Sequence, residues 1–168
     1  MTHVHFIGIG GSGLSAIARL LLESGYTVSG SDRALTPFAD EVRHAGATVY
    51  IGHHPRNIAG ADSVVMSSAI GADNPEVLAA KHANIPVYKR ADFLGQLMAD
   101  KKGIAIAGTH GKTTTTAMTA WVLSELGRDP VAFNRRSQLE RRKRAFKSGG
   151  QLDGSPSALE SRCQLDRH

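Results

Sequence analysis

The chain has 168 residues, of which 41% are hydrophobic, and a formal net charge of +5. This length accommodates one ordinary domain, or a smaller domain and part of another. No apolar run approaches the roughly 20 residues that cross a bilayer, and the single Cys163 excludes an intrachain disulfide and a Cys-based metal cluster. Because Val4 to Ile7 is strand-like rather than a basic signal segment, we expect a cytoplasmic protein with no membrane contact.

The positive charge is confined to one end of the sequence. Residues 1–129 carry eleven Lys and Arg against eleven Asp and Glu, whereas residues 130–168 carry nine against four. A basic surface is the main feature that a nucleic-acid partner requires. We therefore expect no nucleic-acid binding by the folded part of the chain.

Short apolar runs alternate with helix-compatible segments, which is typical of an α/β protein with a parallel sheet. The expected strands are residues 4–9, 26–29, 47–51, 63–66, 86–88 and 103–107. The expected helices are residues 14–22, 37–44, 75–83, 91–99 and 115–126. Thr36 and Pro37 suit an N-cap and a first helical residue, and Gly25, Gly46 and Gly127 suit helix C-termini.

A polar break at residues 100–103 separates two apolar segments and predicts a domain boundary. We expect a Rossmann-like domain at residues 1–99, the start of a second domain at 100–129, and a basic tail of low order at 130–168.

A complete G-x-G-x-x-G motif follows the first expected strand at residues 8–13, and Asp32 ends the next. Its glycines allow a diphosphate to approach a helix N-terminus, and Asp32 can accept a ribose hydroxyl. NAD and a nucleotide-sugar both meet this description. The predicted diphosphate contacts are Gly10, Gly11, Ser12 and Gly13.

Small polar residues follow the expected strand at 63–66, at the sheet edge where open α/β sheets bind ligands. Ser67 and Ser68 lie directly after that strand, and Asn74 precedes an expected helix. They are candidate ligand contacts, although Ser67-Ser68 is equally typical of a strand end followed by a turn.

A second glycine-rich segment joins the expected strand at 103–107 to the helix at 115–126. It departs from G-x-x-x-x-G-K-[ST], because Ile106 stands where the first Gly belongs. Strand, turn and helix N-terminus still predict a phosphate loop for ATP. The candidate residues are Gly108, Thr109, His110, Gly111, Lys112, Thr113 and Thr114, with Lys112 as the cation and Thr113 as the Mg²⁺ ligand.

Several spaced motifs together resemble the Mur ligases of peptidoglycan synthesis, and among them the branch that adds L-alanine to UDP-N-acetylmuramate. The resemblance runs from about His5 to Asp129. The matching segments are residues 5–15, 28–32, 52–53 with 57–58, 64–70 with 74–76, and 107–114.

The resemblance implies a first domain for the UDP-sugar and a central domain for ATP and Mg²⁺. The lactyl carboxylate of UDP-N-acetylmuramate would be phosphorylated, and L-alanine would then attack the acyl phosphate. Lys112 would neutralise phosphate charge, and His110 would either shape the turn or transfer a proton. Near the UDP diphosphate the resemblance places Asp32, His53, Ser67, Ser68 and Asn74. Adjacent His53 and His54 alone do not make a metal site.

The family character ends after Asp129, where an Arg- and Ser-rich sequence begins. Such a composition predicts disorder, with a short helix at about residues 138–146 as an option. We interpret the change as a frameshift or a truncated gene, which would leave the chain without ligase activity. The alternatives are a non-catalytic UDP-sugar-binding module, an NAD-dependent oxidoreductase, and a genuine basic tail that binds RNA or an anionic surface.

Overall fold

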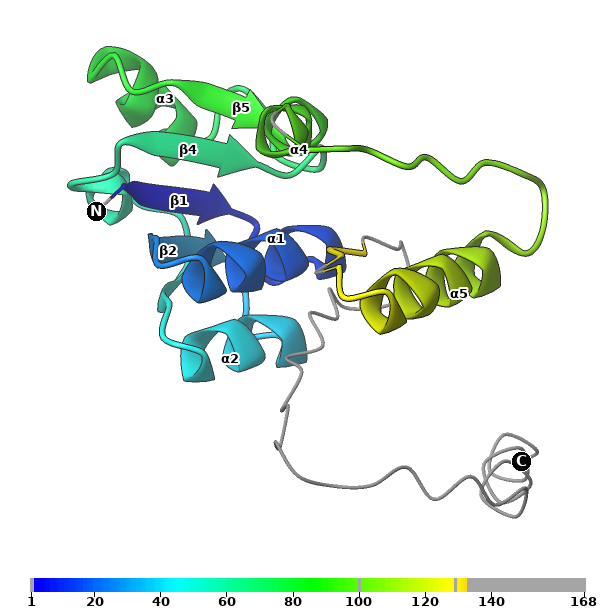
Figure 1. Ribbon diagram of the computed structural model, residues 1–168. Helices are drawn as coiled ribbons and strands as arrows, with labels where there is room; N and C mark the ends of the chain where they lie inside the picture. The colour runs from blue at the N-terminus through cyan, green and yellow to red at the C-terminus, as the bar shows by residue number, and fades with distance from the viewer. Residues whose placement is uncertain (1, 100, 129, 133–168) are drawn as a thin grey trace.

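The computed structural model describes residues 2–99, 101–128 and 130–132 (Figure 1). Five parallel strands form one sheet in the order β3-β2-β1-β4-β5. The strands are β1 (His3–Ile7), β2 (Thr27–Asp32), β3 (Thr48–Ile51), β4 (Ser63–Met66) and β5 (Val87–Lys89). The helices are α1 (Ser12–Glu23), α2 (Pro37–His44), the 3₁₀ helix η1 (Pro55–Ile58), α3 (Pro75–His82), α4 (Arg90–Met98) and α5 (Lys112–Glu125). This order confirms the expected Rossmann-like α/β sheet. The chain adds β2 and β3 on one side of β1 and β4 and β5 on the other, so the topological switch point lies between β1 and β4.

Helices cover both faces of the sheet, because alternate residues of a buried strand point to opposite faces. On one face, Phe6 and Val65 pack in a core with residues of α1, α2 and α4. On the other face, Ile7 and Val64 pack with residues of η1 and α3. His5 therefore points to the α3 face, which is the face that carries the polar cluster described below.

Local signals in the sequence explain where the helices begin and end. The hydroxyl of Thr36 accepts the N–H of Ala39 at the start of α2, as expected for an N-cap. Gly25, Gly46 and Gly127 have φ of 84°, 111° and 75°, which confirms them as the left-handed residues that follow helices.

The strand expected at residues 103–107 does not form. Residues 102–108 have no regular secondary structure, and Ile104 is 61% exposed. A strand requires a neighbour for its backbone groups, and in the described residues the sheet ends at β3 and β5. Figure 1 shows the segment as a long connector that carries α5 away from the sheet.

Helix α5 differs from the helices of the sheet domain because none of its residues is buried. Met118 is 63% exposed, Trp121 56% and Leu126 70%. The disorder and the short helix expected in the basic tail lie outside the described residues, as does Cys163. Among the helices that the structure describes, none combines the length and the apolar character that a membrane span requires.

Candidate nucleotide-binding site

The first glycine-rich turn joins β1 to α1 and is held in place by the end of β2. The N–H groups of Gly8 and Ile9 both donate to the carbonyl oxygen of Ser31, at 2.8 and 3.1 Å. The N–H of Gly10 donates to Oδ2 of Asp32 at 2.8 Å. The turn is therefore fixed by the sheet and does not depend on a ligand for its shape.

Gly10 has no room for a side chain. A Cβ atom there would lie 2.5 Å from Oγ1 of Thr36 and 2.8 Å from Oδ2 of Asp32. The hydroxyl of Thr36 also donates to the carbonyl of Gly10 at 3.0 Å. In this structure Asp32 shapes the turn, and its contact with a ribose stays a prediction.

The N-terminus of α1 presents positive charge at the turn. Its N-cap, Gly11, has no side-chain cap, and the described residues provide no acceptor for the N–H groups of Ser12 and Gly13. The guanidinium of Arg90, the first residue of α4, lies against Gly13 in the space that a side chain would occupy. Free N–H groups, a helix N-terminus and an arginine all favour an anion.

The small polar residues after β4 have structural roles. Ser67 lies beside the glycine turn, since a Cβ at Gly8 would be 3.1 Å from that of Ser67, and its hydroxyl accepts the N–H of Ala69 at 3.4 Å. Ser68 is exposed in the following turn. Asn74 caps α3 by accepting the N–H of Glu76 at 2.9 Å. Contacts of these three residues with a ligand remain predictions.

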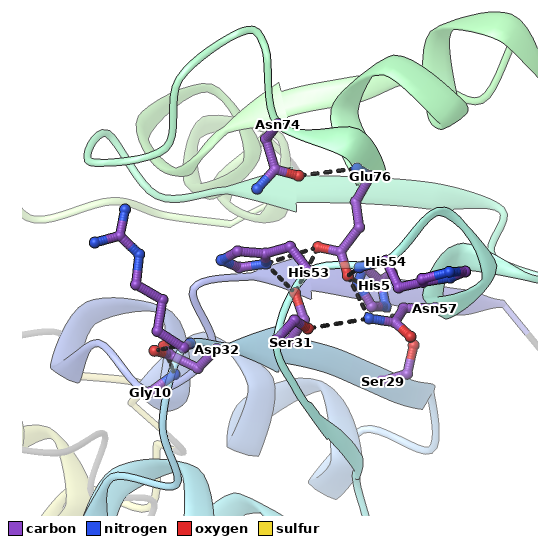
Figure 2. Close-up of polar contacts among 12 residues, drawn as sticks. His5, Gly10, Ser29, Ser31, Asp32, His53, His54, Asn57, Asn74 and Glu76 are labelled. Carbon is purple, nitrogen blue, oxygen red and sulfur yellow. Dashed lines mark hydrogen bonds and ion pairs between the residues drawn. The ribbon is translucent and has the colours of Figure 1, made fainter.

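His53 belongs to a buried polar cluster around the carboxylate of Glu76 (Figure 2). The hydroxyl of Ser31 donates to Oε2 of Glu76 at 2.5 Å, and Nδ1 of His53 lies 3.1 Å from the same oxygen. Asn57 Nδ2 donates to Oε1 at 2.6 Å, and the N–H of His54 reaches it at 3.3 Å. We call Glu76, Ser31, His53, Asn57 and His5 the Glu76 cluster.

The Glu76 carboxylate is ionised although it is fully buried. Burial opposes ionisation, but interactions with His5, Ser31 and Asn57 outweigh it and lower the pKa from 4.5 to about 2. Nε2 of His5 lies 3.8 Å from Oε1 of Glu76, which is longer than a hydrogen bond. That Nε2 is the one buried side-chain polar atom in the described chain without a hydrogen-bond partner.

The sequence interpretation missed Arg90 and the members of the Glu76 cluster other than His53. Asn57 and Glu76 stand in segments that carry the family resemblance, so the motif was a signal for them. His5 and Ser31 also stand in such segments, and strand alternation places both at buried positions. Arg90 carries no local signal, because only the fold brings the start of α4 to the first turn.

The second glycine-rich segment has the expected turn and helix N-terminus, but the expected strand before it does not form. Gly111 is the N-cap of α5 with φ of 76°, and α5 begins at Lys112. The Lys112 ammonium donates to the carbonyls of Gly108 and Thr109, the latter at 3.1 Å. No residue of α5 is buried, and these hydrogen bonds of the loop are local ones.

A magnesium site is incomplete in the described part of the chain. Those residues contain no group of three or more His, Cys, Asp or Glu that could hold a metal ion. Mg²⁺ with a nucleotide needs only one or two protein oxygens in addition to phosphate oxygens. The hydroxyl of Thr113, in the first turn of α5, fits such a limited role.

A family model for the catalytic domain of Mur ligases matches residues 3–102. The chain belongs to the Mur ligase family. It is also similar to a UDP-N-acetylmuramate–alanine ligase from Thermotoga maritima, with 32% identity and a TM-score of 0.74, over 84% of this chain and 35% of the other.

Two murein peptide ligases are similar to nearly the same degree. The enzyme from Psychrobacter arcticus has 26% identity and a TM-score of 0.72, over 94% of this chain and 35% of that one. The enzyme from Neisseria meningitides has 32% identity and a TM-score of 0.69, over 78% and 42%. The chain thus spans less than half the length of these Mur ligases.

Proposed function

We propose that residues 1–99 bind UDP-N-acetylmuramate for a ligase that joins it to L-alanine. The observation that supports this most directly is the first glycine turn, which combines unpaired N–H groups of α1 with the guanidinium of Arg90. Together they suit the two negative phosphates of a nucleotide-sugar. The membership of the Mur ligase family favours this ligand over NAD.

We further propose that residues 100–129 contribute the phosphate loop of the ATP site. ATP, when bound with Mg²⁺, supplies the phosphoryl group that activates the substrate carboxylate. Gly108 to Gly111 would offer backbone N–H groups, and Lys112 would leave the loop carbonyls to neutralise phosphate charge. Thr113 would ligate Mg²⁺. His110 is proposed to line the loop.

A murein peptide ligase is the second candidate. The Neisseria enzyme, whose named acceptor is L-alanyl-γ-D-glutamyl-meso-diaminopimelate, shares 32% identity with this chain, the same value as the alanine ligase. Both candidates use the same nucleotide-sugar. Only the acceptor, L-alanine or a peptide, separates them.

Calorimetry on the purified 168-residue chain tests the nucleotide-sugar site. UDP-N-acetylmuramate, ATP with Mg²⁺, and NAD are titrated separately, and we expect saturable binding of the UDP-sugar and none of NAD. Arg90→Ala should weaken UDP binding by about 10-fold or more, because a charge-assisted hydrogen bond is lost, and leave uridine binding unchanged. Lys89→Ala is the matched control. NAD binding, or an equal loss with Lys89→Ala, contradicts the proposal.

Phosphate release tests what this chain does with ATP. We expect no alanine-dependent or peptide-dependent release by the 168-residue chain, because α5 has no buried residue and Thr113 is the one magnesium ligand that we propose in the described residues. Release that depends on L-alanine would show that the site is complete. Release that depends only on the peptide would favour the second candidate.

A further inference from the structure

The imidazole of His53 has one nitrogen inside the Glu76 cluster and one outside it. Nδ1 lies 3.0 Å from Oγ of Ser31 and 3.1 Å from Oε2 of Glu76. The side chain is 15% exposed, whereas that of Glu76 is fully buried. Figure 2 shows one ring nitrogen directed at Glu76 and Ser31 and the other on the opposite side of the ring, toward the space between Asn74 and Asp32.

The protons available around Nδ1 determine the tautomer of His53. Oε2 of Glu76 and Oγ of Ser31 are 2.5 Å apart, a separation that requires the single Ser31 proton between them. Nδ1 of His53 lies within hydrogen-bond distance of both oxygens, and neither has another proton to offer. Nδ1 must therefore carry a proton, and in the uncharged ring Nε2 is then an acceptor.

The Glu76 carboxylate cannot rotate away from Ser31 and His53, because its other oxygen is also bonded. Oε1 of Glu76 accepts from Nδ2 of Asn57 at 2.6 Å and from the N–H of His54 at 3.3 Å. Asn57 is itself held, since it also donates to the carbonyl of Gly52 at 3.2 Å. Three elements, β2, η1 and α3, thus fix the carboxylate that orients His53.

The exposed side of His53 faces the proposed nucleotide site. His53 follows β3, Ser31 and Asp32 end β2, and Glu76 opens α3, so all of them lie at the carboxyl edge of the parallel sheet. This edge is where open α/β sheets bind ligands. The first glycine turn is connected to the same place through Ser31, whose carbonyl accepts the N–H groups of Gly8 and Ile9.

We propose that Glu76 is a positioning residue for the nucleotide-sugar, because it and Ser31 hold His53 with Nε2 facing the ligand as a hydrogen-bond acceptor. This inference rests on the function proposed above. Nε2 would accept a hydrogen bond from an N–H or a hydroxyl of the uridine or sugar. A phosphate oxygen does not fit the uncharged ring, because it would face the lone pair of Nε2.

The variant Glu76→Gln should reverse the tautomer of His53. Asn57 Nδ2 and the His54 N–H keep the amide oxygen of the new side chain on their side. Its NH₂ group then faces Ser31 and Nδ1 of His53, which becomes an acceptor. Nε2 would then carry the proton. Two hydrogen-bond donors would face each other, and the hydrogen bond to the ligand would be lost.

Nitrogen NMR and calorimetry on the 168-residue chain test the two parts of this inference. Long-range ¹H–¹⁵N spectra at neutral pH distinguish the tautomers, and His53→Gln assigns the signals among the eight histidines. We expect the Nδ1–H form in the wild type and the Nε2–H form in Glu76→Gln. Binding of UDP-N-acetylmuramate should weaken about 10-fold, the effect of one lost hydrogen bond.

Ser29→Ala is the matched control, because it removes a buried hydroxyl that bonds His3 and His5 but not His53. It should retain the tautomer and the affinity of the wild type. An Nε2–H tautomer in the wild type, unchanged affinity in Glu76→Gln, or an equal loss in Ser29→Ala would overturn the inference while the proposed function stands. A wild type that binds no UDP-sugar would overturn both.

Discussion

The two glycine-rich turns have similar local sequences and very different surroundings. In the first, Gly10 is bonded to Asp32 and Thr36, and the guanidinium of Arg90 lies against Gly13. In the second, Lys112 bonds to carbonyls of its own loop, and α5 buries no residue. A motif determines the turn and the helix N-terminus, but neighbouring elements determine whether the turn is a preorganised site.

This contrast extends to how the two regions are stabilised. Buried apolar side chains on both faces of the sheet support the first turn. The second adjoins α5, which has no buried residue in the described part of the chain, and an isolated helix of 14 residues is marginal in water. Mutations should therefore affect the two regions unequally.

The largest difference is expected between a core aromatic residue and the exposed tryptophan. Phe6 is fully buried and packs edge to face against Phe93, with 6.2 Å between the ring centroids. Phe6→Ala should lower the free energy of unfolding by about 3–5 kcal/mol through lost burial and a cavity. Trp121→Ala, at a position 56% exposed, should change it by less than about 0.5 kcal/mol. Urea unfolding followed by circular dichroism measures both, and comparable losses would show that α5 shares the core.

The next effect concerns the Glu76 cluster and appears as a dependence on pH. The folded-state pKa of Glu76 is about 2, below the ordinary 4.5, so the ionised carboxylate stabilises the fold. This stabilisation is complete above pH 4.5 and is lost as the pH falls toward 2. The difference corresponds to about 3 kcal/mol.

Urea unfolding between pH 2 and 7 measures this dependence, with Glu76→Gln as the comparison. The variant cannot ionise at this position, so its stability should fall less steeply with acid than that of the wild type. Parallel curves for the two proteins would show that Glu76 does not account for the acid sensitivity. The second turn has no ionised buried group in the described residues, so Lys112→Ala should leave the curve unchanged.

The sequence predicted the parallel sheet well because its signals are local. Apolar runs, the Thr36 cap and the C-terminal glycines each act within a few residues, and the structure confirms them. The prediction of a strand at residues 103–107 was wrong, because an apolar run forms a strand only when a neighbouring strand pairs with its backbone. The first glycine turn was predicted by its motif. The contact with Arg90 and the tautomer of His53 depend on residues far apart in the chain, which a linear reading does not place together.

A smaller effect is expected within the first turn itself. Gly10→Ala places a methyl group against Thr36 and Asp32, so we expect a loss of about 1–3 kcal/mol from overpacking. Gly11→Ala is the control, because its Cβ would meet only the carbonyl of Gly8 at 3.4 Å, and it should cost less than about 1 kcal/mol as a poorer N-cap. Chemical unfolding of both variants checks this order. Equal losses would show that the tight fit at Gly10 is not what constrains the turn.

The smallest effect on the sheet domain is expected from the corresponding change in the second turn. Gly111 has φ of 76°, and a Cβ there would meet only Oγ1 of Thr115 at 4.0 Å, so Gly111→Ala strains the backbone without a clash. The strain of about 1–2 kcal/mol should appear as faster amide exchange in α5, because a left-handed alanine opposes the start of that helix. Amides of β1 and β4 should exchange as in the wild type. Faster exchange in these strands would mean that the second turn and the sheet unfold together, and the contrast between the two turns would then be one of local geometry alone.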